Sequence, residues 1–157
     1  MLIAAALITV FGVPAHPLLV HAVVVLTPLA ALGALVLAAR PAWSRPYGFL
    51  VAAGALGGAV SATLAMLTGE QLEAAIDVTP EFAPVIEQHA QFGTLTVWTT
   101  WPFAVLAIAA VVADRRAGGA APRIVAALSA VSGVAAVVLT VLAGHSGADA
   151  VWGFVTQ

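Results

Sequence analysis

The chain has 157 residues, of which 62% are hydrophobic and 8% are charged, and its formal net charge is -2. Soluble domains are about 45–50% apolar and about 25% charged, so this composition excludes an ordinary water-soluble protein. The absence of cysteine excludes disulfides and cysteine-ligated metal sites, and the absence of a basic patch excludes nucleic acid as a partner.

The N-terminal segment, residues 1–13, is apolar but shorter than the roughly 20 residues that a membrane-spanning helix needs. It also lacks the basic residues that begin a secretory signal peptide. We therefore expect an interfacial or re-entrant segment that stays attached, with a cleaved signal as the alternative.

Four uncharged apolar runs of spanning length follow, and proline, glycine or charged residues mark their ends. They predict helices over residues 17–39, 47–67, 89–113 and 122–143. The connection between the second and third runs contains an amphipathic stretch and two prolines, so we expect it to be partly helical. The predicted fold is all-α: a single integral-membrane domain over residues 1–157, built as a four-helix bundle with a short N-terminal interfacial segment and a partly helical outer loop.

Charge is distributed unevenly along the chain. All five arginines lie in the connections between the first and second runs and between the third and fourth, whereas six of the seven acids lie at the opposite ends. Because arginine in short loops favours the cytoplasmic side, we expect these loops in the cytoplasm and both termini outside. All four histidines are then extracytoplasmic.

Small residues recur at four-residue spacing in two of the runs, as in Gly54 and Gly58 and in Ser129 and Gly133. In lipid, helices associate through close backbone approach, which small residues permit. These positions are therefore candidate packing seams.

The four histidines, His16, His21, His89 and His145, are the strongest candidates for a site. Counted back from the inner charges at about 1.5 Å per residue, all four fall in one layer roughly 9 Å deep near the outer membrane boundary. His21 lies inside an apolar run, where a polar ring needs a partner in the bundle interior. His16 and His145 lie at helix ends, where interfacial histidines are common.

Two kinds of ligand suit this layer. Neutral imidazoles from two helices, His21 with His89 or His21 with His145, suit a six-coordinate haem b, and a four-helix bundle can hold one. Three histidines with Glu70 or Glu87 would instead suit a zinc, copper or iron ion. The spacing does not choose between haem and a metal ion.

No Ser-His-Asp order, paired-carboxylate pattern or phosphate loop is present, so we expect an electron carrier or binding protein rather than a stand-alone enzyme. A third interpretation is a structural subunit or assembly factor of a larger membrane complex, in which the histidines only satisfy interfacial polarity.

Several segments resemble one known family: residues 12–21, Thr68-Gly69-Glu70, Glu87-Gln88-His89 and residues 144–153. Together they resemble the small bacterial, especially actinobacterial, membrane proteins catalogued as domain of unknown function 2231, over essentially the whole chain. The resemblance implies a four-helix protein of the bacterial inner membrane with its polar motifs on one side. Family members are sometimes joined to Rieske-type or cytochrome-type modules, which implies redox partners. The resemblance also places five residues on family motifs: His16, His21, Glu70, His89 and His145. Similar proteins can carry Asp in place of His145.

Our leading hypothesis is a b-type haem electron-transfer protein, ligated by His21 and His89, with His145 or His16 as a substitute ligand. The alternative is a divalent-metal site drawn from the four histidines with Glu70 and Glu87. A redox partner, a larger complex and a homo-oligomer all stay open.

Overall fold

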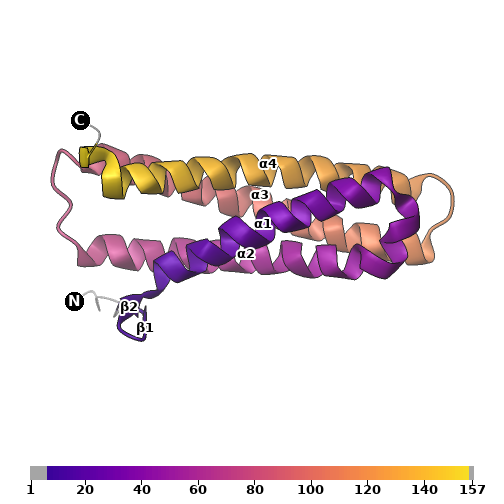
Figure 1. Cartoon of the computed structure of the whole chain (residues 1–157), viewed down its shortest axis with the longest axis horizontal. Helices are drawn as coiled ribbons and strands as arrows, with labels where there is room; N and C mark the ends of the chain where they lie inside the picture. The colour runs from indigo at the N-terminus through magenta and orange to yellow at the C-terminus, as the bar shows by residue number, and fades with distance from the viewer. Residues whose placement is uncertain (1–6, 156–157) are drawn as a thin grey trace.

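The computed structural model describes residues 7–155, so part of the expectation for the N-terminal segment lies outside the described residues. Four long helices pack side by side and run alternately up and down (Figure 1). They are α1 (Ala15–Ala39), α2 (Ser44–Ala75), α3 (Ala83–Arg116) and α4 (Ala121–Trp152). Each is long and apolar enough to cross a membrane, which confirms the predicted all-α bundle.

Three of the helices extend well beyond the predicted ends on the histidine side. α2 continues to Ala75 instead of ending at residue 67, α3 begins at Ala83 instead of residue 89, and α4 runs to Trp152 instead of residue 143. The sequence prediction stopped at the first polar residues, but a helix continues wherever its backbone hydrogen bonds can form. The partly helical connection therefore consists mostly of the ends of α2 and α3.

Short elements join the helices and precede them. A two-stranded hairpin, β1 (Thr9–Val10) with β2 (Val13–Pro14), leads directly into α1. Its turn residues Phe11 and Gly12 both have positive φ, as the tight turns of hairpins require. The 3₁₀ helices η1 (Pro41–Trp43) and η2 (Gly153–Val155) follow α1 and α4.

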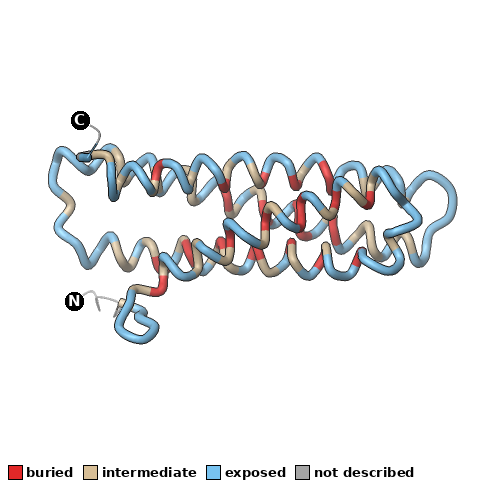
Figure 2. Tube along the Cα trace, in the orientation of Figure 1, coloured by how far each residue is buried: buried red, intermediate tan, exposed pale blue. Residues whose placement is uncertain are grey.

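The core of the bundle consists of small side chains. Its cluster of buried residues contains alanines from all four helices and one large side chain, Phe103. Large apolar side chains such as Leu29 and Val131 lie exposed on the outside, as expected of a lipid-facing surface. Figure 2 shows the buried positions along the inner faces where the helices meet. The predicted seam positions Gly58, Ser129 and Gly133 are among them.

The two ends of the bundle differ in charge. The arginines lie where α1 passes to α2 and where α3 passes to α4. There Arg45 Nε lies 3.8 Å from Asp114 Oδ2, which pairs the one acid found among the arginines. The histidines and the other six acids lie at the opposite end, so imidazoles and carboxylates are the titratable groups that a site at that end can use.

Candidate functional site

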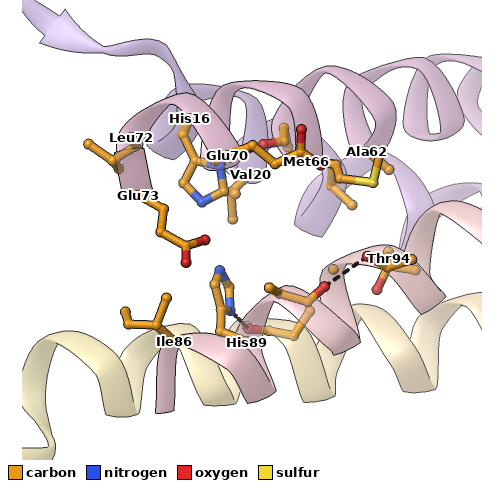
Figure 3. A pocket seen from close by; sticks show the side chains of 18 of the residues that line it. His16, Val20, Ala62, Met66, Glu70, Leu72, Glu73, Ile86, His89 and Thr94 are labelled. Atoms are coloured by element: carbon orange, nitrogen blue, oxygen red, sulfur yellow. Dashed lines mark hydrogen bonds between the residues drawn. The ribbon is translucent and has the colours of Figure 1, made fainter. Parts of the chain in front are cut away.

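A cavity of about 180 Å³ opens between the helices at the histidine end of the bundle. All four helices line it, mostly with apolar side chains, and His16, Glu70, Glu73 and His89 are its titratable residues. Figure 3 shows the two imidazoles facing each other across it, one from α1 and the other from α3. The cavity therefore collects two of the four candidate histidines.

His16 lies in the first turn of α1 and is held by α2. Its Nδ1 lies 2.7 Å from the backbone oxygen of Ala65. The ring also packs against Gly69, one turn further along α2, where a Cβ atom would lie 3.0 Å from Nδ1 and from Cε1. The bond and the close packing together fix the plane of this ring.

His89 lies near the start of α3 and is held by α4 in the same way. Its Nδ1 lies 3.1 Å from the backbone oxygen of Ala143 and 3.2 Å from Ser146 Oγ. A Cβ atom at Gly147 would lie 2.9 Å from Cε1 of the ring and 3.2 Å from Nδ1. The ring of His89 thus has a carbonyl, a hydroxyl and a glycine as its supports.

These hydrogen bonds determine which ring nitrogen carries the hydrogen. A carbonyl oxygen can only accept, so Nδ1 of both His16 and His89 must donate. In a neutral imidazole, Nε2 is then unprotonated and has a free lone pair. Metal-ligating histidines usually donate their second nitrogen to a carbonyl or carboxylate in this way.

The two rings are placed as a pair. Their centroids lie 6.0 Å apart and their planes are 87° apart. In Figure 3 the Nε2 atoms of His16 and His89 point toward one another across the gap. Two metal–nitrogen bonds of about 2.0 Å, with roughly 1.1 Å from each nitrogen to its ring centre, would put two trans imidazoles about 6 Å apart. The observed spacing therefore fits one metal centre held between the two rings.

The number of protein ligands bears on the kind of metal centre. Among residues 7–155, no group of three or more His, Asp or Glu side chains is placed to hold a metal ion. A zinc site takes three or four protein ligands, whereas haem brings four nitrogens of its own and needs at most two from the protein. Two opposed imidazoles match the number of protein ligands that haem needs.

Small side chains line the space beside the rings. At Gly93 and Gly144 an added Cβ atom would meet nothing within 4 Å, so both face open space. Ala62, Ala90 and other alanines continue this lining. Flat, uncrowded walls suit the face and edge of a macrocycle. A porphyrin is larger than the cavity of about 180 Å³ and would extend beyond it.

Two acids from α2 flank the cavity. Both Glu70 and Glu73 are exposed lining residues, and the carboxylate of Glu73 points toward the space beside the two rings (Figure 3). Their negative charge would favour a cationic centre between the imidazoles. Glu70 is among the residues predicted from the sequence, whereas Glu73 is not.

The other predicted site residues lie elsewhere. His21 is exposed, not directed into the bundle, and its Nδ1 bonds the carbonyl of Pro17 in its own helix at 2.6 Å. His145 is exposed and pairs with Asp149 at 3.5 Å. Glu87 is exposed and accepts a hydrogen bond from Gln91. The structure brings together His16 and His89, and not the expected pairs of His21 with His89 or His145.

The reason is the angular position of each histidine around its helix. Val23 lies on the buried face of α1, and His16, seven residues earlier, is only about 20° from it at about 100° per residue. His21 is two residues from Val23 and hence about 160° away. In α3, His89 likewise lies seven residues before the buried Thr96 and therefore on nearly the same face of the helix. α1 is apolar all round, so its sequence did not indicate which face is buried.

Sequence reasoning also missed the groups that support the rings. They are the carbonyls of Ala65 and Ala143, the hydroxyl of Ser146, and the glycines Gly69 and Gly147. The sequence does contain a pattern that could have pointed to these groups, because a hydroxyl residue directly precedes each of the two glycines: Thr68 before Gly69 and Ser146 before Gly147.

Comparison with known proteins gave one match. A family model described as Predicted membrane protein (DUF2231) matches residues 12–157. No curated protein and no solved structure matches the chain.

Proposed function

The chain belongs to the DUF2231 family of predicted membrane proteins, and from that premise we propose that it is a b-type haem protein that transfers electrons, in which His16 and His89 would hold the haem. The observation that carries the proposal is the pair of opposed imidazoles, 6.0 Å apart, each with its Nδ1 on a backbone carbonyl. His16 replaces His21 as the partner of His89, because His21 is exposed and bonded within its own helix.

The residues of the site have separate roles. His16 and His89 would hold the haem through their Nε2 atoms, and the carbonyls of Ala65 and Ala143 keep the rings in the Nδ1-protonated form. Bound haem b supplies one-electron redox chemistry at its iron. The apolar lining limits access of water, which is one of the ways in which a protein sets a reduction potential.

The side of the membrane follows from the arginines. They lie at one end of the bundle and the histidine pair at the other. By the positive-inside rule, the arginine end faces the cytoplasm of a bacterial inner membrane, and the site faces the outside. Electrons would then be exchanged with a redox partner on the extracytoplasmic side.

The divalent-metal alternative has less support. Two imidazoles occupy only half of a four-coordinate zinc site, and the described residues contain no group of three or more His, Asp or Glu side chains placed to hold a metal ion. Glu70, Glu87, His21 and His145 do not join the pair in a common cluster.

Optical spectroscopy tests the proposed function. The protein is purified from haem-replete cells, or titrated with haemin, and spectra are recorded after air oxidation and after dithionite reduction. We expect a sharpened α band and a shifted Soret peak on reduction, the signature of a six-coordinate low-spin centre. A colourless preparation whose spectrum does not respond to haemin would rule out the proposal.

A further inference from the structure

The two halves of the site repeat one another in detail. His16 of α1 bonds the carbonyl of Ala65 in α2, and its ring packs against Gly69 four residues later. His89 of α3 bonds the carbonyl of Ala143 in α4, and its ring packs against Gly147 four residues later. Each half is one helical hairpin, in which the first helix supplies the imidazole and the second supplies the carbonyl and the glycine.

The repetition extends to the hydroxyl residue before each glycine. Thr68 is buried and its Oγ1 donates to the carbonyls of Leu64 and Ala65. Ser146 is buried and its Oγ donates to the carbonyl of Ala143. In both hairpins a buried hydroxyl therefore bonds the same carbonyl that fixes the imidazole.

The buried faces of the first helices coincide as well. A shift of 73 residues carries His16 onto His89, and the same shift carries five buried positions of α1 onto the buried positions of α3. The pairs are Val23 with Thr96, Thr27 with Thr100, Ala30 with Phe103, Ala31 with Ala104, and Ala34 with Ala107.

The second helices coincide under a shift of 78 residues, which carries Ala65 onto Ala143 and Gly69 onto Gly147. Five buried positions again correspond: Ala52 with Ala130, Ala55 with Gly133, Gly58 with Ala136, Ala62 with Thr140, and Thr68 with Ser146. The second shift is larger mainly because α3 runs further past His89 than α1 runs past His16, whereas the connections 40–43 and 117–120 are equally long. Since the helices alternate in direction around the bundle, half a turn about its long axis exchanges one hairpin with the other.

We propose that the chain consists of two tandem copies of one ligand-holding hairpin, related by a pseudo-two-fold axis. Gly69 and Gly147 are then equivalent positioning residues, which set the ring planes of His16 and His89 on either side of this axis. This inference rests on the proposed function for the identity of the ligand. It adds that His16 and His89 are equivalent positions for holding that ligand, and that their ring planes are perpendicular, at 87°.

The glycines act on ring orientation more than on folding. A methyl group at Gly69 or Gly147 would meet ring atoms at 2.9–3.0 Å, and an imidazole is a side chain that can rotate away. Rotation removes Nδ1 from its carbonyl while the helix backbones stay in place. We therefore expect Gly69→Ala and Gly147→Ala to leave the fold intact and to change the histidine on their own side of the axis.

The first test needs no haem. Histidine-ring ¹⁵N spectra of the cofactor-free protein in detergent, assigned with His16→Gln and His89→Gln, report which nitrogen of each ring carries the hydrogen. We expect the Nδ1–H form for both rings. We also expect that Gly69→Ala shifts only the His16 signals and that Gly147→Ala shifts only the His89 signals. Gly118→Ala, where a Cβ meets nothing within 4 Å, is the control and should shift neither. An Nε2–H form of either ring, or unchanged signals in both glycine variants, would overturn the inference.

The second test uses the haem-loaded protein. Perpendicular imidazole planes give a strongly anisotropic low-spin electron paramagnetic resonance signal, whereas parallel planes give an ordinary rhombic one. We expect the anisotropic signal from the unsubstituted protein and a shift toward the rhombic type in Gly69→Ala and Gly147→Ala. A rhombic signal before substitution would overturn the perpendicular arrangement. Failure of haem to bind would refute the proposed function, while the ¹⁵N spectra would still decide whether the two hairpins are equivalent.

Discussion

His16 and His89 are separated by 73 residues in the sequence, yet their rings lie 6.0 Å apart at 87° with their Nε2 atoms facing each other. Each ring is held by the next helix in the chain, through a carbonyl of α2 for His16 and of α4 for His89. The pair therefore depends on the packing of one helical hairpin against the other.

The histidines should differ sharply in their effect on haem binding. We expect His16→Ala and His89→Ala each to weaken haem affinity at least about tenfold and to abolish the low-spin spectrum, because either change removes an axial ligand. His21→Ala and His145→Ala are matched controls at the same end of the bundle, and both residues are exposed. The measurement is the reduced α band per mole of protein after reconstitution. Equal losses in all four variants would contradict the assignment.

Ser146 should tune the site through His89. Its Oγ lies 3.2 Å from Nδ1 of His89, so Ser146→Ala removes one of two acceptors for that hydrogen. Loss of such an outer partner commonly lowers metal affinity 10–100-fold. Because the bond to the carbonyl remains, we expect a loss of about tenfold, at the lower end of this range. Haemin titration measures it. Thr99→Val, which removes a half-buried hydroxyl bonded within α3, should leave the affinity unchanged.

Glu73 should lower the reduction potential of the site. Its carboxylate points toward the space beside the rings, where a negative charge favours the more positive oxidised state. Glu73→Gln should raise the midpoint potential by roughly tens of millivolts, as expected for one charge at short range in a partly exposed site. Redox titration gives the value. Glu87→Gln is the control, because Glu87 is at the same end but does not line the cavity. A potential that rises equally in both variants would point to the net charge of the surface instead.

A tryptophan on α3 should stabilise the contact between α2 and α3. The Trp101 Nε1–H group donates to Thr63 Oγ1 at 3.0 Å, and this is a hydrogen bond between side chains of different helices. Trp101→Phe should lower the free energy of unfolding by about 1 kcal/mol, the usual net contribution of one such bond. Thermal or denaturant unfolding in detergent measures the change. Trp98→Phe is the control, since Trp98 is 73% exposed on the same helix, and it should change stability less.

The small-residue seam in α4 should be sensitive to an added methyl group. A Cβ atom at Gly133 would lie 3.0 Å from Phe103 and 3.1–3.2 Å from Ala31, including its Cα atom, so the neighbouring backbone would have to move. Overpacking of this kind costs about 1–3 kcal/mol, and Gly133→Ala should lower stability by an amount in that range. Gly118→Ala meets open space and should leave it nearly unchanged. The comparison of their unfolding temperatures is the measurement, and similar values would argue against a tightly packed seam.

The number and type of the helices followed from the pattern of uncharged apolar runs in the sequence. Long uncharged runs such as the one after Pro17 can satisfy their backbone groups in lipid only as helices, so the sequence predicts four of them. The helix ends were predicted less well, because polar residues such as Glu70 and His89 interrupt an apolar run without interrupting backbone hydrogen bonding.

The sequence by itself determined that this is a multi-pass membrane protein with its histidines at one end, because apolar length and charge distribution are properties of each segment taken alone. Which histidines meet was decided only by tertiary structure. His16 and His21 both lie on an apolar helix, and the packing of α1 against α2 and α4 turns His16 inward and His21 outward. The carbonyl and the glycine that hold each ring belong to the next helix of the same hairpin, so they act only once that hairpin has formed. The two rings meet only once the hairpins have packed together.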